Sequence, residues 1–259
     1  MRFGFRTIAF KRFPLEFALK TIAKTGYDGA ELCLESEELN PFHLSLHEIM
    51  RIKQILEDNN LEISAVSLHT DFVESEKDFE GVLKGIEITK DFGHKIFIIS
   101  PGYLMNSSKQ TRLEKLKEKL SALLKEAKKR EIILALEPEP GMTIETSSEL
   151  LDLIHYFNSD NLKVNLDIGH LKCVGESIEA SIIALKDYIV HVHLEDIKDR
   201  VHKHLVPSEG DLEIKEALQT LKAINYNGFV IIDLFDLEDP ESAAKCSIKK
   251  IEEILNKLT

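Results

Sequence analysis

The chain has 259 residues, of which 43% are hydrophobic, and a formal net charge of −12. This length can bury the core of one α/β barrel or of two small domains, and the negative charge disfavours nucleic acid and anionic membranes as partners. The first residues lack the apolar core of a signal peptide, and no run approaches the roughly 18 apolar residues of a membrane span. We therefore expect a cytoplasmic protein without a membrane partner, whose three cysteines are reduced.

Short β-rich runs alternate with longer helical patterns along the whole chain. The predicted strands are residues 2–8, 29–34, 62–69, 95–100, 132–138, 162–168, 189–195 and 229–235. The predicted helices are residues 14–25, 45–59, 76–92, 108–130, 147–157, 177–187, 213–225 and 240–258. This alternation predicts an α/β fold, a (β/α)8 TIM barrel that forms a single domain over residues 1–259. A doubly wound open sheet is the alternative, but no glycine-rich phosphate loop follows the first predicted strand.

Polar residues in the last four predicted strands alternate with apolar ones. Successive side chains of a strand point to opposite faces, so this alternation separates the helix-covered outside of the barrel from its interior. In the seventh strand the predicted outward set is Val190, Val192 and Leu194. The polar residues with inward parity include, near the carboxyl ends of the four strands, Glu137, Asp167, His193 and Asp233. That end of a barrel is where active sites are built.

Three carboxylates and one imidazole suit a divalent cation such as Mn²⁺, Mg²⁺, Co²⁺ or Zn²⁺. Without a cation they would be costly to bury, because carboxylates repel one another and ionised groups resist desolvation. The alternative is that they are exposed polar residues at loop ends. His69, at the end of the third strand, has inward parity and is expected to line the same pocket, unless it is a core histidine. Glu139 contacts substrate or is a solvated acid.

Four segments of the chain resemble the xylose isomerase-like TIM-barrel family, which contains sugar isomerases, sugar epimerases and the endonuclease IV enzymes. They are ALEPEPG (135–141), NLDIGH (165–170), HVHLED (191–196) with VPSEGD (206–211), and YNGFVIIDLF (226–235). The resemblance covers essentially the whole chain. It implies one divalent metal ion, held by Glu137, Asp167, His193 and Asp233. It also implies an isomerase or epimerase of a small sugar or sugar derivative, which removes a proton next to a carbonyl.

By the same resemblance, Glu137 and Asp233 would be the two catalytic carboxylates on opposite faces of the substrate. The chain departs from the family here, because the last ligand is usually glutamate and Asp233 is one methylene shorter. That departure favours one-face isomerisation, or a shifted substrate, if the Asp233 carboxylate does not reach.

The resemblance also implies further substrate-binding residues. His170 matches a family histidine that contacts substrate oxygens, and His204 is expected to do the same. The family's arginine lies six residues after the ligand histidine, where this chain has Asp199, so its role is assigned to Arg200. In endonuclease IV an Asp-x-His pair and one more histidine hold a further zinc. His170, His202 and His204 could offer a comparable second metal site.

Two functions of other classes remain as alternatives. The first is a DNA-repair phosphodiesterase of the endonuclease IV type, which is disfavoured by the net charge of −12 and by Ser100, where those enzymes have a zinc-binding histidine. The second is a non-catalytic metabolite-binding barrel. The expected partner is a small carbohydrate, nucleic acid is not expected, and a homo-oligomer stays open.

Overall fold

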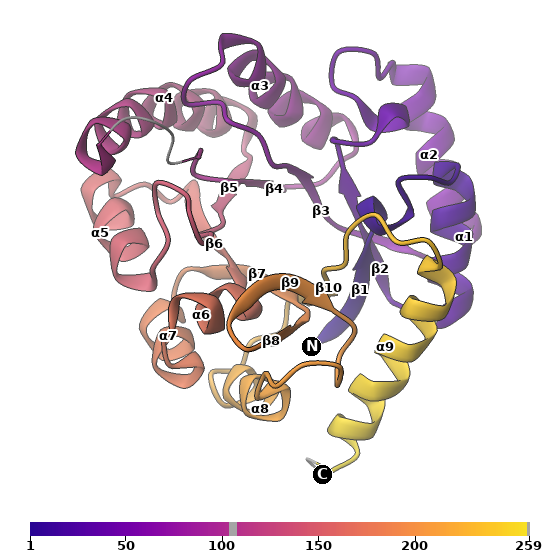
Figure 1. Cartoon of the computed structure of the whole chain (residues 1–259). Coiled ribbons are helices and arrows are strands. Elements are labelled where there is room, and N and C mark those ends of the chain that lie inside the picture. The colour runs from indigo at the N-terminus through magenta and orange to yellow at the C-terminus, as the bar shows by residue number, and fades with distance from the viewer. Residues whose placement is uncertain (104–107, 258–259) are drawn as a thin grey trace.

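Eight short parallel strands hydrogen-bond side by side into a closed barrel, in the order β1-β10-β7-β6-β5-β4-β3-β2 (Figure 1). This computed structural model describes residues 1–103 and 108–257. The barrel strands are β1 (Arg2–Arg6), β2 (Gly29–Cys33), β3 (Glu62–Leu68), β4 (Ile96–Ile99), β5 (Ile133–Leu136), β6 (Leu162–Asp167), β7 (Ile189–Leu194) and β10 (Phe229–Ile232). All eight coincide with predicted strands to within a few residues, and the predicted (β/α)8 barrel is confirmed.

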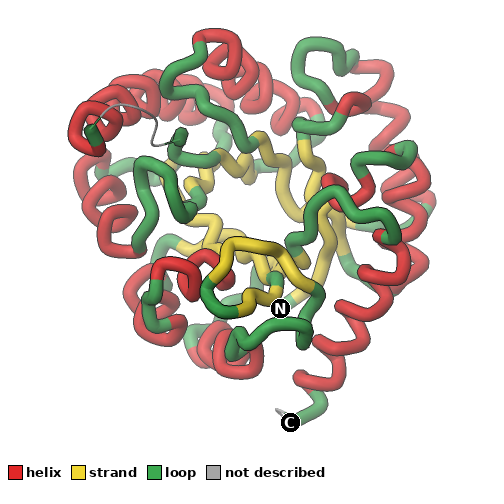
Figure 2. Tube along the Cα trace, in the orientation of Figure 1, coloured by secondary structure: helices red, strands yellow, loops and turns green. Residues whose placement is uncertain are grey.

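Helices surround the barrel, as Figure 2 shows in red. Those predicted from the sequence are α1 (Leu15–Thr25), α2 (Leu46–Asp58), α3 (Glu76–Asp91), α4 (Lys109–Arg130), α5 (Ser147–Phe157), α7 (Ile178–Leu185), α8 (Ile214–Ala223) and α9 (Pro240–Leu255). Side-chain caps define several starts: Ser45 and Thr146 each form a capping box with the glutamate three residues on. Helix α9 ends at Leu255, whereas the helix predicted there ended at residue 258, which lies outside the described residues. Within the described part of the chain, no helix is long and apolar enough to cross a membrane.

The apolar core has two parts. The larger part fills the layer between the strands and the helices, and its members on β7 include Val192 and Leu194. A smaller cluster inside the barrel consists of Ala65, Ile98 and Ala135. Residues with polar side chains continue the strands beyond this small cluster, toward the carboxyl end of the barrel.

The predicted orientation of Val190 is wrong. Val190 packs against the small interior cluster, while Ile189 joins the outer core. The cause is a register shift between β6 and β7: Val164 pairs with Ile189, but Asn165 pairs with His191, so Val190 is an extra residue in the ladder. A β-bulge of this kind reverses the alternation locally, and a strict two-residue period cannot show it.

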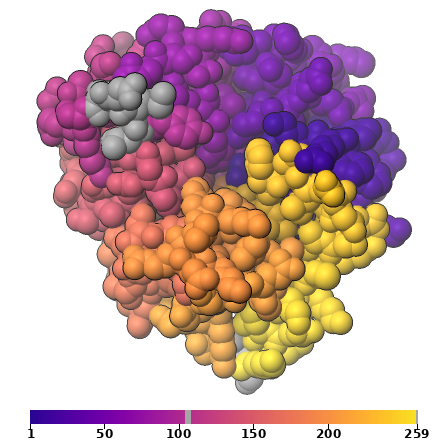
Figure 3. Space-filling view, viewed as in Figure 1, coloured from indigo at the N-terminus to yellow at the C-terminus, as the bar shows by residue number. Residues whose placement is uncertain are grey.

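The segment between β7 and α8 forms an additional hairpin that the sequence analysis did not predict. Strands β8 (Asp196–Lys198) and β9 (Val201–Leu205) pair antiparallel, and a helix, α6 (Ile168–Val174), begins directly after β6. Short 3-10 turns, η1 (Thr7–Phe10) and η2 (Glu37–Leu39), follow β1 and β2. In Figures 1 and 3 the hairpin (orange) and the segment after β10 (yellow) border the open end of the barrel.

Candidate active site

The four residues predicted as metal ligands meet at the carboxyl end of the barrel. One donor atom from each of Glu137, Asp167, His193 and Asp233 lies within 4.8 Å of the others. The Nδ1 atom of His193 is 3.2 Å from Glu137 Oε2, 3.4 Å from Asp233 Oδ2 and 4.0 Å from Asp167 Oδ2. All four side chains are buried. The parity argument therefore placed these four side chains on the inner face, where the structure brings them together.

The donor set fits a divalent cation. Within residues 1–103 and 108–257, no hydrogen-bond partner is found for the buried Oδ2 atom of Asp167. Three buried carboxylates around one imidazole nitrogen repel one another unless a positive charge lies between them. Oxygen donors with one nitrogen suit Mn²⁺, Mg²⁺, Co²⁺ or Zn²⁺, so the residues present match the kind of ion that the sequence predicted.

Arg6, at the end of β1, contacts the last of these carboxylates and was missed in the sequence. Its Nη1 atom is 2.9 Å from Asp233 Oδ1 and 2.8 Å from Oδ2, and its Nε atom is 2.9 Å from Glu31 Oε1. Burial favours the protonated form of Asp233, but Arg6, His204 and His193 outweigh it and lower the pKa of that carboxyl to about 2. Asp233 is thus held as an ionised carboxylate by a buried arginine.

Glu31, on β2, was missed as well. Its Oε2 atom is 2.6 Å from Nε2 of His193, on the side of the ring away from the other carboxylates. Burial opposes ionisation of Glu31, but His193 and Arg6 lower its pKa. Burial favours a neutral His193 ring, but Glu31 and Glu137 raise its pKa well above the usual value. A cation bound at Nδ1 would therefore displace a proton from this ring.

His69 lies against Glu137, on the cavity side that its parity predicted. Its Nε2 atom is 3.1 Å from Glu137 Oε2, and its Nδ1 atom is 2.8 Å from Glu35 Oε1. Burial lowers the pKa of His69, but Glu137 and Glu35 outweigh burial and the nearby Arg6 and raise it well above the usual value. The ring therefore bridges two carboxylates, one at the site and one, Glu35, nearer the rim.

His191 is an interior hydrogen-bonding residue. Burial lowers its pKa to about 3, so the ring is neutral, and its Nδ1 atom donates to Asn165 Oδ1 at 2.8 Å. This contact turns the amide nitrogen of Asn165 toward Glu137, where it donates to Oε2 at 2.6 Å. His191 thereby helps to orient Glu137 through Asn165.

A cavity of about 420 Å³ opens above the site. It is lined by Arg6, Ile8, Lys11, Glu35, His69, Tyr103, Glu137, Glu139, His170, His202, His204, Asp233 and Phe235. The structure thus brings together every predicted substrate-binding residue except Arg200. That residue lines a separate surface cavity with Lys172 and Glu176, and its Nε atom donates to the Lys172 carbonyl. It lies in the turn of the β8–β9 hairpin at a φ of 60°, so the hairpin carries it away from the position that the family's spacing implied.

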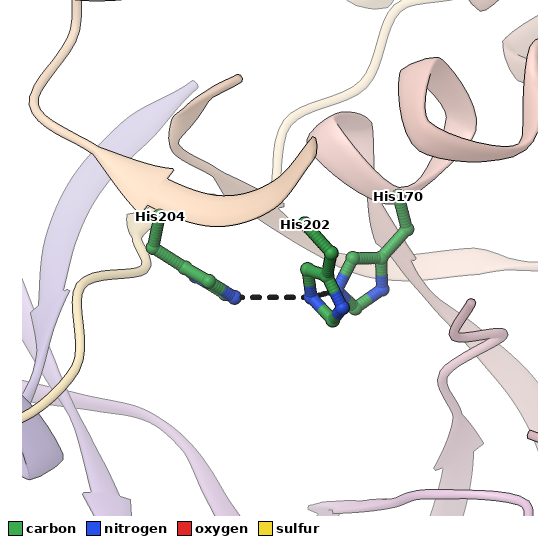
Figure 4. A group of neighbouring side chains, drawn as sticks. All are labelled: His170, His202 and His204. Atoms are coloured by element: carbon green, nitrogen blue, oxygen red, sulfur yellow. Dashed lines mark hydrogen bonds between the residues drawn. The ribbon is translucent and has the colours of Figure 1, made fainter. Parts of the chain in front are cut away.

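Three histidines converge at one side of this cavity (Figure 4). The Nε2 atom of His202 is 3.0 Å from Nε2 of His170 and 3.3 Å from Nε2 of His204. His170 Nδ1 is 3.0 Å from the Pro138 carbonyl, and His204 Nδ1 is 3.0 Å from the Asp233 carbonyl. Donation from these two Nδ1 atoms leaves both Nε2 atoms facing His202. Partial burial and the two neighbouring rings lower the pKa of His202 to about 4.

Glu195, directly after β7, is a further buried carboxyl at the site. In the described chain, no N–H or hydroxyl group donates to either of its oxygens, and the protonated acid can itself hydrogen-bond to Asp167. Its oxygens also come within 4.8 Å of donor atoms of His170, His204 and Asp233. Burial, with Asp167 and Asp233, raises the pKa of Glu195 well above the usual value. A Cβ atom at Gly169 would collide with this carboxyl, so the glycine is required for the close approach.

Comparison with known proteins places these features in a family. Residues 19–254 match the sequence model of the xylose isomerase-like TIM barrel. The L-ribulose-5-phosphate 3-epimerase UlaE of Escherichia coli is 24% identical over 235 residues, which cover 85% of this chain and 82% of that protein. A D-tagatose 3-epimerase-like protein has a TM-score of 0.82 at 22% identity, with 100% of both chains covered.

The probable 3-DHS dehydratase AsbF of Bacillus anthracis has the same fold, with a TM-score of 0.83 at 20% identity over 97% of this chain and 99% of that one. Structural similarity at these identities establishes the fold alone, and activities differ among proteins that share it. The sequence match, in contrast, covers most of the chain. The chain therefore belongs to the xylose isomerase-like TIM-barrel family.

Proposed function

We propose that the protein is a divalent-metal-dependent isomerase or epimerase of a small sugar or sugar derivative. The observation that carries this proposal is the convergence of Glu137, Asp167, His193 and Asp233 at the base of a cavity of about 420 Å³. The similar E. coli protein is named as a sugar epimerase, which supports the same activity class.

The four converging residues would hold the metal. When bound, a divalent cation supplies Lewis acidity that polarises a substrate carbonyl and acidifies the neighbouring C–H bond. We assign removal of that proton to Glu137, whose Oε2 atom is fixed by Asn165 and by His69. Asp233 is the candidate for returning the proton on the opposite face.

The two candidate carboxylates differ in their surroundings. Both oxygens of Asp233 lie within hydrogen-bond distance of Arg6, whereas Glu137 contacts His69, which can exchange a proton with it. An arginine keeps its charge at any physiological pH, so it favours an Asp233 that stays ionised. The contact between Arg6 and Asp233 therefore favours isomerisation, in which Glu137 removes and returns the proton on one face of the substrate. Epimerisation would require Asp233 to accept and release a proton beside Arg6.

The cavity is rich in hydrogen-bond acceptors, which suits a substrate with several hydroxyl groups. Glu35 Oε2 is buried and lacks a hydrogen-bond partner among the described residues, and Glu139 lines the same cavity. The Nη1 group of Arg6 donates to Asp233, the rest of its guanidinium lies against Glu31, and the other cation of the lining, Lys11, is exposed. This balance of charge favours an unphosphorylated sugar over a sugar phosphate.

We further propose that His170, His202 and His204 bind a second metal ion. The three Nε2 atoms of His170, His202 and His204 lie close enough to bind one ion together, and three nitrogens with an open fourth position suit Zn²⁺. The alternative role for these rings is to contact substrate hydroxyls in the cavity that they line.

The proposal is tested by metal analysis of the purified protein, followed by deuterium exchange from solvent into a panel of ketoses and their phosphates. We expect bound divalent metal and exchange into unphosphorylated ketoses. Glu137→Gln should lower the exchange rate by about 10²-fold or more, because a general base contributes about that much, while circular dichroism shows an intact fold. Exchange that survives this substitution would remove Glu137 from the mechanism.

The same preparation separates the other function classes. A phosphodiesterase would cleave duplex DNA that contains abasic sites, with a steep salt dependence. A metabolite-binding barrel would bind sugars without any exchange. Ser100, at the end of β4, donates to the Thr70 carbonyl, so a hydroxyl with another partner stands where the DNA-repair enzymes have a zinc-binding histidine.

A further inference from the structure

We propose that Glu31 and Arg6 are positioning residues that set the geometry of two of the four metal donors. Glu31 orients the ring of His193, and Arg6 orients the carboxylate of Asp233. This inference rests on the metal site proposed above. The two residues are buried and charged, lie on β1 and β2, and contact His193 and Asp233.

Glu31 selects the form of His193 that can bind a cation. Its Oε2 atom lies 2.6 Å from Nε2 of the ring, while Nδ1 faces Glu137 at 3.2 Å and Asp233 at 3.4 Å. When Nε2–H donates to Glu31, the lone pair of a neutral ring is on Nδ1, the nitrogen that points at the other donors. The opposite tautomer would place an N–H group among the carboxylates and would leave Glu31 facing a lone pair.

Arg6 connects this carboxylate to the opposite side of the site. Arg6 and Glu31 are paired neighbours in the β1–β2 ladder, and Nε of Arg6 lies 2.9 Å from Glu31 Oε1. The Nη1 atom of the same guanidinium reaches both oxygens of Asp233, at 2.9 and 2.8 Å. The contact with Glu31 is an ion pair without hydrogen-bond alignment, whereas Nη1 donates to Asp233 from a rigid planar group, which a flexible ammonium group could not reproduce.

The contacts form a closed circuit around the metal position. It runs from Asp233 on the β10 side through Arg6 and Glu31 to His193 on β7, the strand that pairs with β10. Glu31 and His193 are 0% exposed, Asp233 is 1% exposed and Arg6 is 6% exposed. A buried ion pair of this kind is weak evidence for fold stability, since desolvation offsets much of its attraction. Its position behind two donors instead indicates a role in orienting them, because outer partners of this type tune metal affinity.

The test is Mn²⁺ binding to the full-length protein by calorimetry, at one pH, for Glu31→Gln and Arg6→Lys. Loss of an outer-shell partner typically weakens metal binding about 10- to 100-fold, and we expect both variants to fall in that range. Arg6→Lys retains the charge but loses the fork that contacts two carboxylates at once. Glu62→Gln is the matched control, because Glu62 is an exposed carboxylate at the start of β3, and its Mn²⁺ affinity should equal that of the wild type.

A second readout separates orientation from general support of the fold. With a diamagnetic ion such as Zn²⁺ bound at Nδ1, Nε2 of His193 is protonated in both proteins, so the readout is the ¹H chemical shift of that Nε2–H group. The proton should lie further downfield in the wild type, where it is donated to a carboxylate, than in Glu31→Gln, where the acceptor is a neutral amide. If the wild type bound no metal, the proposed site itself would be wrong, and this inference with it. If the wild type bound Mn²⁺ and either variant matched its affinity, the positioning role of that residue alone would be overturned.

Discussion

Replacing Glu195 by glutamine should stabilise the metal-free protein at neutral pH. The carboxyl of Glu195 is fully buried, and burial together with Asp167 and Asp233 raises its pKa well above the usual value. A carboxyl with a raised pKa in the folded state takes up a proton on folding at neutral pH. Its contribution to stability is therefore full below the unfolded pKa of about 4.3 and is lost as the pH rises toward the folded pKa.

The size of this effect follows from proton linkage. Within that pH window, each pH unit costs the wild type about 1.4 kcal/mol relative to a residue that takes up no proton. Glutamine has the shape of the protonated acid, offers an N–H donor toward Asp167 and does not titrate. The free energy of unfolding of Glu195→Gln should therefore exceed that of the wild type by a margin that grows by up to about 1.4 kcal/mol per pH unit.

Urea unfolding in the presence of a chelator, at several pH values above about 4.5, measures this margin. Glu62→Gln serves again as the control, because its side chain is exposed and its replacement should change stability little at any pH. A margin that stays constant with pH, or a variant less stable than the wild type throughout, would refute the argument that Glu195 is buried as a neutral acid.

Two further changes probe the same region. His202→Ala should lower the zinc content of the reconstituted protein by one ion per chain, because it removes the nitrogen that lies between His170 and His204. Mass spectrometry measures this content, and an unchanged value would argue that the three rings bind substrate only. Gly169→Ala should lower the free energy of unfolding by about 1 to 3 kcal/mol, because the added Cβ would collide with the Glu195 carboxyl. Thermal unfolding measures this loss, and wild-type stability would mean that the carboxyl can move aside.

The alternation of polar and apolar residues was enough to find the main site. It placed Glu137, Asp167, His193 and Asp233 on the inner face, and the structure brings their donor atoms within 4.8 Å of one another. The period of two residues works because parallel strands of a closed barrel have one inner and one outer face. It fails at Val190, where a bulge inserts one residue into the ladder.

The supporting residues were harder to find, although their signal was present. Arg6 alternates with Phe3 and Phe5, and Glu31 alternates with Ala30 and Leu32, so both have inward parity. The sequence does not show what they contact, because Arg6 and Asp233 are 227 residues apart and meet only when the barrel closes. For Arg200 the prediction used the distance along the chain from the ligand histidine, as it is in the family. The position of Arg200 depends instead on the turn of the β8–β9 hairpin, which that distance does not describe.

The hairpin that carries His202 and His204 is attached to the barrel through one residue in particular. The carboxylate of Asp196 accepts hydrogen bonds from the backbone nitrogens of Ser208 and Leu212, which fixes both ends of the loop at its base. The four converging ligands lie on other segments, at the ends of β5, β6, β7 and β10. The hairpin can therefore be exchanged as a cassette between Asp196 and Leu212, so that evolution or design can alter what enters the cavity while the four ligands are kept, and the loss of His204 would change only the setting of Asp233.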